Sequence, residues 1–403
     1  MIWIALFLAI QAVCGVVPGQ ANRLPAFMLV SYFTFSVTTQ LLALPLALLS
    51  IVLALFAEGA AVWILAGAAV LFAYAHWRNR QAGRIMLDAL GQTHTRIPLL
   101  AGLAPAMVGQ TRSRRIKDLA YGHESERNVL DLVVPRTPGE APMPILIHIH
   151  GGGWVVGNKN QQAKPLLNHL AGNGWMCVDA TYRLGPKDRG PAMIVDVLKT
   201  IAWVKAHAHE YGGDPSRIAI TGESAGGHLA ALAALAHDDP TLKPGFEGAD
   251  CSVAMALPIY GRYDFAERLD TFGKNKKAVL AMMSKSVMPG PPERYPALWT
   301  AMSPLDRVRA DAPPMLIANG TGDTLIPYED ARSFVAALRG ASSATVRHVE
   351  LPGIQHMFDF ASSALVWAHV RAVEAFLAPL ANPEAAGRQT GFARGEPALA
   401  GAA

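Results

Sequence analysis

The first 77 residues contain almost no charge, and this property restricts their structure more than any other feature of the chain. Arg23 and Glu58 are their only Arg, Lys, Asp or Glu residues, and most other positions are Leu, Ala, Val, Ile or Phe. Apolar runs of this kind are typical of helices that cross a bilayer. We therefore expect an all-helical transmembrane segment over residues 1–78, with the lipid bilayer as its partner.

Three apolar runs fit this expectation. Residues 1–17 and 60–77 each have about the length that crosses a hydrocarbon core about 30 Å thick. Residues 27–57 would measure roughly 46 Å as one helix, so this run should kink or tilt, and Pro45 lies near its middle. About three spans follow, with four as the alternative. No basic residue precedes the first run, so a retained helix is favoured over a cleaved signal peptide.

The charge after the last run predicts its orientation. Between Arg78 and Lys117 there are eight basic residues and one acidic residue, Asp88, a net charge of +7. Basic residues that flank a span stay on the cytoplasmic side, so we expect the C-terminal part to be cytoplasmic. Residues 79–115 are predicted to form a basic juxtamembrane linker, which also suits anionic headgroups. The alternative is a basic linker that meets no membrane.

Composition excludes several other classes of protein. The net charge of the 403 residues is only +4, and no basic stripe is interleaved with aromatic residues, which argues against a nucleic-acid partner. Cys14, Cys177 and Cys251 are scattered and form no CxxC pair. This pattern argues against a disulfide framework and against a zinc site, and favours buried free thiols.

After residue 117, strand patterns alternate with helical patterns. The predicted strands are 129–134, 145–150, 175–180, 217–221, 252–259, 314–319 and 345–351, and the predicted helices are 192–209, 225–237, 328–338 and 363–377. This order predicts an α/β domain over residues 116–380, with a mostly parallel twisted sheet, an antiparallel start and helices on both faces. Residues 381–403 are rich in Ala, Gly and Pro and are predicted to be a disordered tail.

A Gly-x-Ser-x-Gly sequence, residues 222–226, connects the strand 217–221 directly to a helix. A serine at the apex of such a turn sits in strained backbone, and side chains two residues away would collide with neighbouring elements. The helix N-terminus behind Ser224 favours negative charge that develops near its hydroxyl. We therefore interpret Ser224 as a nucleophile, and we expect Glu223 to support it.

A serine nucleophile needs a base, and the base needs a third group that orients it. In this type of fold the chain order is Ser, then Asp or Glu, then His, on loops that follow late strands. Asp323 follows the strand 314–319, and His356 follows the strand 345–351. We therefore expect Ser224, Asp323 and His356 to act together, with Asp330 and Asp359 as alternatives for the acid.

Three consecutive glycines follow the strand 145–150. Glycine permits both a sharp turn and a close approach of backbone N–H groups to a bound oxyanion. We expect the N–H groups of Gly152 and Gly153, together with that of Ala225, to form an oxyanion hole. His150 and Gly151 are expected to support this loop.

Five short motifs together resemble a known family. They are HGGGW (150–154), YRLGP (182–186), GESAGGHLA (222–230), GTGD (320–323) and GIQHMFD (353–359). The chain resembles the hormone-sensitive-lipase-like esterases of the α/β-hydrolase superfamily, including actinobacterial carboxylesterases, over about residues 115–380. The resemblance implies the same triad and oxyanion hole, carboxylic ester substrates, and neither metal nor cofactor. The segment LGPKDRGPA (184–192) departs from the family pattern, and membrane spans replace its usual N-terminal cap.

Residues 262–305 are longer than a simple crossover and are predicted to cap the pocket. Met255, Met282, Met283 and Met288 either line an apolar pocket surface or pack in the core. The leading interpretation of the whole chain is a membrane-anchored carboxylic ester hydrolase. An acyltransferase or amidase with the same triad, and an inactive membrane interaction protein, are the alternatives.

Overall fold

One sheet organises the C-terminal part of the chain. The computed structural model describes residues 1–17, 26–103, 112–137, 139–361 and 363–382. In this part of the chain the strands are β1 (Ser113–Ala120), β2 (Val129–Pro135), β3 (Met143–Ile149), β4 (Met176–Ala180), β5 (Gly213–Glu223), β6 (Met255–Ile259), β7 (Met315–Gly320) and β8 (Val346–Leu351). They form one sheet in the order β1-β2-β4-β3-β5-β6-β7-β8. β2 is antiparallel to β1 and β4, and the other pairs are parallel, which confirms the predicted α/β fold.

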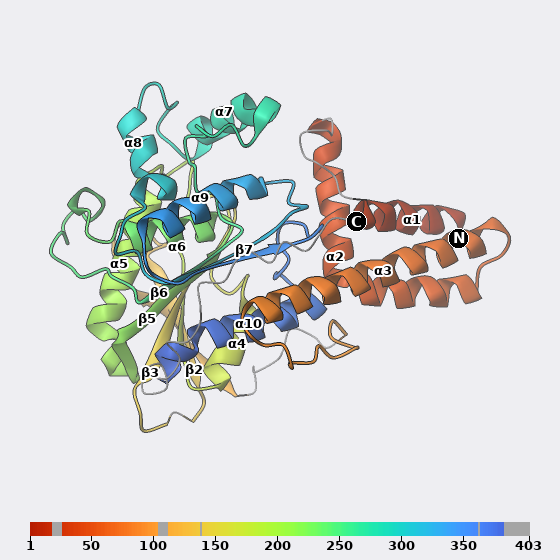
Figure 1. The fold of residues 1–403 in the computed structure, drawn as a ribbon, viewed down its shortest axis with the longest axis horizontal. Helices are drawn as coiled ribbons and strands as arrows, with labels where there is room; N and C mark the ends of the chain where they lie inside the picture. The colour runs from red at the N-terminus through yellow and green to blue at the C-terminus, as the bar shows by residue number, and fades with distance from the viewer. Residues whose placement is uncertain (18–25, 104–111, 138, 362, 383–403) are drawn as a thin grey trace.

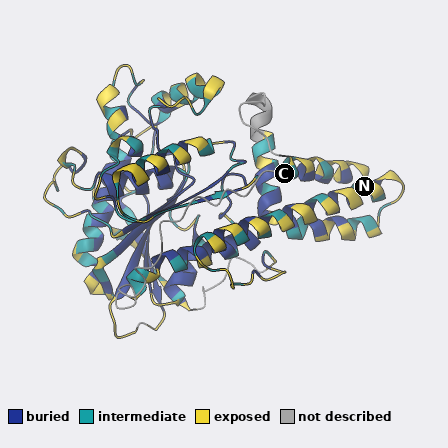
Figure 2. Ribbon diagram, viewed as in Figure 1, coloured by how far each residue is buried: buried dark blue, intermediate teal, exposed yellow. Residues whose placement is uncertain are grey.

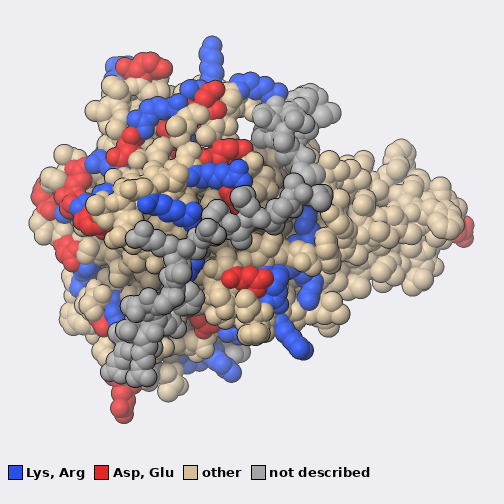
Figure 3. All heavy atoms as spheres, viewed as in Figure 1, with Lys and Arg blue, Asp and Glu red and all other residues tan. Residues whose placement is uncertain are grey.

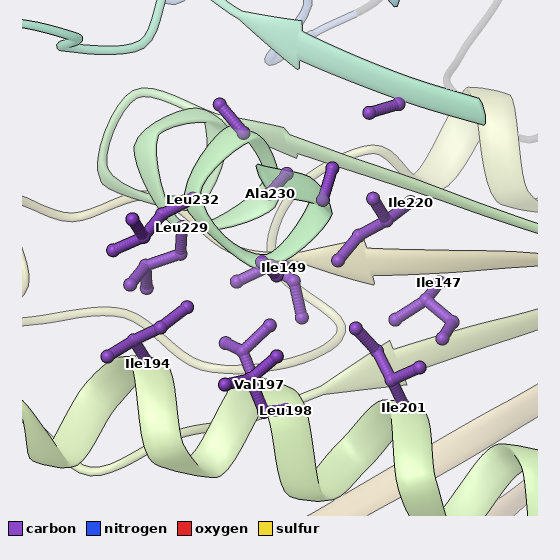
Figure 4. Packing of buried hydrophobic residues seen from close by; sticks show 14 of the residues in the cluster. Ile147, Ile149, Ile194, Val197, Leu198, Ile201, Ile220, Leu229, Ala230 and Leu232 are labelled. Carbon is purple, nitrogen blue, oxygen red and sulfur yellow. The ribbon is translucent and has the colours of Figure 1, made fainter. Parts of the chain in front are cut away.

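Side chains of the central strands alternate between two apolar clusters, one on each face of the sheet. On β3, Ile147 and Ile149 belong to one cluster, and Leu146 belongs to the other. The first face is covered by α5 (Ala192–His207), α6 (Ala225–Leu235) and α9 (Tyr328–Ala341), and the second by α4 (Lys164–Gly172) and α10 (Ala364–Ala381). Figure 4 shows Ile194, Val197, Leu198 and Ile201 of α5 directed toward β3 and α6. The strands and the inner sides of these helices are accordingly buried (Figure 2).

Three N-terminal helices form an arm that projects from the sheet domain (Figure 1). They are α1 (Ile2–Val16), α2 (Ala26–Leu55) and α3 (Ala60–Ala89). α2 has a break at Leu42 (φ −115°, ψ 21°), three residues before Pro45. Proline lacks an N–H group and clashes with the preceding turn, which bends the helix as the sequence predicts. The part of α2 before the bend lies across the base of the arm, and the part after it runs beside α3.

The surface of the arm is apolar and almost free of charge (Figure 3). Trp3 and Trp63 are 80% and 79% exposed, although most tryptophans of soluble proteins are largely buried. By length and composition, Ser31–Leu55 of α2, the helix α3 and the helix α10 are apolar enough to cross a membrane. α10, however, packs on the sheet, whereas the other two belong to the arm. Arg23 lies outside the described residues.

The predicted linker 79–115 differs from the structure. Its first residues continue α3 as far as Ala89, and its last residues begin β1. The second half of α3 packs on the sheet domain, because Ala82 and Met86 belong to the same apolar cluster as α10. A Cβ atom at Gly83 would lie only 2.9 Å from the Cβ of Ala368, so glycine permits this close helix contact. The predicted tail 381–403 lies outside the described residues from residue 383 onward.

We expect a chain that begins at Arg112 to be much less stable than one that begins at Arg78. The shorter chain lacks Met86 and Leu87, which are buried and contribute about 1.5–3 kcal/mol each. It also exposes the apolar face of α10 that α3 covers. Size-exclusion chromatography and thermal unfolding of the two chains measure the difference. Two monomeric chains with the same Tm would contradict the structural role of α3.

Candidate active site

The turn at Ser224 has the strained conformation that the sequence predicts. Ser224 lies between the end of β5 and the start of α6, with φ 58° and ψ −116°. A Cβ atom at Gly226 would lie 1.8 Å from the carbonyl oxygen of Ile149, and one at Gly222 would lie 2.5 Å from the same atom. The two glycines therefore let the turn pack against the end of β3, and this packing holds Ser224 at the edge of the sheet.

Asp323 and His356 lie in hydrogen-bond contact. Asp323 Oδ2 is 2.6 Å from His356 Nδ1, and both side chains are almost completely buried. Asp323 Oδ1 accepts hydrogen bonds from the backbone N–H groups of Leu325 (2.8 Å) and Ile326 (2.9 Å). These two bonds fix the carboxylate, so the oxygen that faces the imidazole has a defined position.

The end of β6 connects this pair to the serine turn. Ser224 N donates to the carbonyl oxygen of Ile259 at 2.9 Å. The next residue, Tyr260, packs its ring on that of His356, with 4.5 Å between the ring centroids. In the described part of the chain, no hydrogen bond joins the Ser224 hydroxyl to His356, so the serine–histidine contact of the predicted triad is not closed in this structure.

The glycine loop packs directly against the serine turn. A Cβ atom at Gly151 would lie 2.6 Å from the carbonyl oxygen of Glu223 and 3.2 Å from Ser224 Cβ. Gly152 and Gly153 have φ values of 121° and 59°, which lie in the region that favours glycine. Gly151 N donates to Gln162 Oε1 at 2.6 Å, and this bond anchors the start of the loop.

Three backbone donors of this region lack an acceptor. Among the described residues, no hydrogen bond is formed by the N–H groups of Gly152, Gly153 and Ala225. Ala225 is the first residue of α6, where an N–H group has no partner within the helix. Unpaired N–H groups beside a helix N-terminus favour a negatively charged group between them.

His150 stabilises the glycine loop through ring stacking and hydrogen bonds. Its ring stacks on Tyr182 with 4.4 Å between centroids, and Tyr182 donates its hydroxyl to the carbonyl oxygen of His150 at 2.9 Å. Burial lowers the pKa of His150 to about 4, so the ring is neutral at pH 7. Its Nδ1 then donates to the carbonyl oxygen of Gly151 at 2.7 Å, and its Nε2 faces Arg127.

Glu223 belongs to a buried ion-pair network under the serine turn. Its Oε2 lies 2.7 Å from His148 Nε2, and His148 Nδ1 lies 2.9 Å from Asp179 Oδ1. Arg115 completes the network through Asp179 and Asp131. Burial opposes the charge of His148, but the two carboxylates outweigh burial and raise its pKa to about 10. The charged ring of His148 therefore links β3, β4 and β5 at Glu223, the residue before Ser224.

The two alternative acids have other partners. Asp330 accepts hydrogen bonds from the backbone N–H groups of Tyr263 (2.7 Å) and Asp264 (2.8 Å), and burial raises its pKa to about 6. Asp359 accepts a hydrogen bond from the hydroxyl of Tyr260, and burial, followed by the charge of Glu223, raises its pKa to about 8. Of the three candidate acids, only Asp323 bonds to His356 within the described residues.

The predicted cap contains two short helices, α7 (Lys276–Ser286) and α8 (Pro296–Ala301). The methionines mostly pack in the core, because Met283 and Met288 are buried in the cluster on the first face and Met255 in the cluster on the second. Met282 is exposed. A cavity of about 270 Å³ lies within residues 266–300 and is lined by none of the predicted site residues.

Residues 184–192, whose sequence departs from the family pattern, connect the predicted cap to the glycine loop. Gly185 N donates to the carbonyl oxygen of Trp154 at 2.9 Å, and Gly190 N donates to that of Val287 at 2.8 Å. A Cβ atom at Gly185 would lie 1.8 Å from the carbonyl oxygen of Ser286. Gly185 therefore lies between the end of α7 and the loop that follows the three glycines.

Comparison with protein families identifies the chain. The sequence model of the BD-FAE family matches residues 130–338, slightly more than half of the chain. The chain belongs to the BD-FAE family. This range contains Ser224 and Asp323 and the three glycines after β3, and it ends before His356.

Relatives of this BD-FAE protein are named as ester hydrolases. The probable carboxylic ester hydrolase LipM of Mycobacterium tuberculosis (strain ATCC 25618 / H37Rv) is 43% identical over 275 residues, which cover 68% of this chain and 63% of LipM. Esterase LipC of the same organism is 37% identical over 277 residues, which cover 68% of each chain. The chain spans slightly less than two thirds of the length of LipM and of esterase LipQ.

A solved structure supports the fold assignment. The propionate-bound esterase Est2 of Thermogutta terrifontis has a TM-score of 0.54 and 24% identity, over 67% of this chain and 94% of Est2. The fold of this BD-FAE protein is that of an α/β-hydrolase.

Sequence reasoning missed several residues that hold the site of this BD-FAE protein. Four residues contact the predicted site residues, but no rule of motif spacing predicts their roles: Gln162, Tyr260, His148 and Gln355. Two of them had a visible signal, because His148 is a histidine inside the apolar strand pattern ILIHIH and Gln355 lies inside the motif GIQHMFD.

Proposed function

We propose that this protein is a membrane-anchored serine hydrolase of carboxylic esters that forms an acyl-enzyme on Ser224. The observation that carries the proposal is the hydrogen bond between Asp323 and His356, a pair that the end of β6 connects to the strained Ser224 turn. Ser224 is the nucleophile in this proposal. His356 is the general base, and Asp323 orients its imidazole.

The first step is attack of Ser224 Oγ on the ester carbonyl carbon. His356 Nε2 accepts the hydroxyl proton, because the bond to Asp323 keeps the other ring proton on Nδ1. The negative oxygen that forms is stabilised by the N–H groups of Gly152, Gly153 and Ala225. A donor of this kind lowers the barrier by about 3 kcal/mol. His356 then returns the proton to the leaving alcohol.

The second step releases the acid. His356 removes a proton from water, and the resulting hydroxide attacks the acyl carbon through the same oxyanion arrangement. Collapse of this intermediate breaks the bond to Ser224 Oγ, and His356 returns the proton to the serine. Each step uses only groups of this chain and water.

Several features support an apolar acyl group as substrate. Val156 follows the glycine loop, Leu325 follows Asp323 and Phe360 follows His356, and all three side chains are exposed. Exposed apolar side chains close in sequence to the candidate site residues suit a hydrocarbon group. The name of LipC supports an ester substrate, and the name of LipM supports carboxylic esters as the general class.

The arm supports anchoring to a bilayer. The start of α1 and the turn that contains Glu58 lie at its far end, and the sheet domain lies at the other (Figure 1). Basic side chains gather where α3 enters the sheet domain, where Arg80 and Arg84 donate to backbone carbonyls of residues 93–98. By the positive-inside rule this end is cytoplasmic.

Membranes from cells that express the full chain are expected to retain ester hydrolysis after carbonate washing, because apolar helices of this length do not dissociate. The assay uses p-nitrophenyl esters of increasing chain length. Membranes with the Ser224→Ala chain are the matched control. Activity that moves into the wash would contradict the anchor, and equal activity in both membranes would contradict the chemistry. Digestion of the sheet domain by protease added outside intact cells would show that the orientation is the opposite of the proposed one.

A further inference from the structure

We propose that Gln40, on the arm helix α2, is a positioning residue for the two loops that carry Asp323 and His356. The catalytic part of this inference rests on the proposed function. The arm then helps to set the active-site geometry, in addition to its role as an anchor.

The side-chain amide of Gln40 pairs with the backbone of Gln355, the residue before His356. Gln40 Oε1 accepts a hydrogen bond from Gln355 N at 2.6 Å, and Gln40 Nε2 donates to Gln355 O at 3.3 Å. Gln40 is 1% exposed and Gln355 is 4% exposed. Two opposed hydrogen bonds fix both the position and the direction of the chain that leads into His356.

The side chain of Gln355 joins the two loops. Its Oε1 accepts hydrogen bonds from the N–H groups of His356 (2.9 Å) and Thr324 (2.7 Å), and Thr324 directly follows Asp323. Its Nε2 donates to Ser36 Oγ at 3.2 Å, on the same arm helix as Gln40. One carbonyl oxygen therefore holds the backbone beside both members of the pair, and α2 determines where that oxygen lies.

The arm in turn fixes Gln40. Asn79 of α3 donates to the carbonyl oxygen of Gln40 at 2.6 Å, and Arg78 donates to that of Val16 at the end of α1 at 3.2 Å. Gln40 also lies two residues before the break at Leu42. All three arm helices therefore meet where α2 touches the site.

An amide at position 40 is costly unless it is fully paired, because burial removes its bonds to water. An apolar residue would suit a helix of this composition better. The hydrogen-bond partners of Gln40 therefore account for the presence of an amide at this position. Catalytic groups tolerate little displacement, and a shift of about 1 Å can reduce the rate about 100-fold. Loss of the Gln40 bonds should therefore appear in kcat.

The test compares Gln40→Met with Thr39→Val in the full chain in detergent. Thr39 is also fully buried, but its hydroxyl bonds within the arm, to the carbonyl oxygen of Gln11. We expect Gln40→Met to lower kcat on a short ester at least 10-fold with KM within twofold, since the side-chain amide of Gln40 bonds to backbone groups of Gln355. Thr39→Val should change neither. An unchanged kcat in Gln40→Met, or an equal fall in both variants, would overturn the proposal.

Hydrogen exchange provides a readout that does not depend on ester turnover. Gln40→Met should speed amide exchange in peptides that cover residues 321–326 and 353–358, and Thr39→Val should leave both unchanged. Equal exchange in the two variants would reject the positioning role even if the wild type hydrolysed no ester. If Gln40→Met does not fold, Ser36→Ala replaces it, because it removes the acceptor of Gln355 Nε2 together with a hydrogen bond inside α2, from Ser36 Oγ to the carbonyl oxygen of Phe33. Normal kcat and normal exchange in Ser36→Ala would then reject the proposal.

Discussion

Ser224→Ala is expected to lower kcat by roughly 10⁵- to 10⁶-fold, the loss that follows removal of a serine nucleophile in other enzymes of this chemistry. Without Oγ no acyl-enzyme can form. The N–H groups of Gly152, Gly153 and Ala225 can still polarise a bound ester, which leaves a small residual rate above that of water. Steady-state kinetics on a p-nitrophenyl ester measure the loss.

The fold should survive this substitution, because alanine is no larger than serine and the φ of 58° is strained for both. Ser216→Ala is a matched control, since Ser216 lies near the opposite end of β5 and its hydroxyl donates to Asp214. It should keep full kcat. A fluorophosphonate should label wild-type Ser224 and leave the Ser224→Ala chain unlabelled. Turnover in that chain with a label at another residue would assign the nucleophile elsewhere.

Asp323→Asn is expected to lower kcat by about 10⁴-fold. The asparagine Oδ1 can keep the bonds from Leu325 N and Ile326 N, which places the amide nitrogen opposite His356 Nδ1. An N–H donor there favours the tautomer whose proton lies on Nε2, and that tautomer cannot accept the proton of Ser224. KM should change little, because both carboxylate oxygens are bonded to groups of the protein.

Two further substitutions serve as controls for this result. Asp359 has a pKa of about 8 and is mostly protonated at pH 7, so Asp359→Asn is nearly neutral in charge and shape. Asp330→Asn loses one acceptor for the N–H groups of Tyr263 and Asp264, which should cost about 1–3 kcal/mol of stability and little kcat. A larger fall in kcat for either variant than for Asp323→Asn would move the orienting role to that residue.

Local sequence patterns were sufficient for the sheet and for the order of the candidate site residues. Short, nearly continuous apolar runs predicted β2 to β8 to within a few residues, because a strand between two helix layers buries both faces. β1 was not predicted, since only one residue of SRRIKDLA is buried. The glycines at 222 and 226 predicted the turn, because their spacing reflects contacts with the adjoining strand.

The boundary of the arm could not be predicted in the same way. The charge of three arginines, Arg78, Arg80 and Arg84, suggested an exposed linker. This charge obscured the apolar helix face formed by Ala82 and Met86. Whether such a face is a helix surface or part of a loop depends on its partner. The partner is α10, which lies almost 300 residues later in the chain.

The sequence by itself determined the features that depend on neighbouring residues: the apolar helices, the strand-to-helix turn at Ser224, and the positions of Asp323 and His356 after their strands. Tertiary structure alone decided which distant groups meet. Gln40 and Gln355 are 315 positions apart, and although Gln355 lies in the motif GIQHMFD, nothing in that motif points to Gln40. A buried amide must find a partner, but the sequence does not say which one, because that choice depends on how the arm and the sheet domain pack.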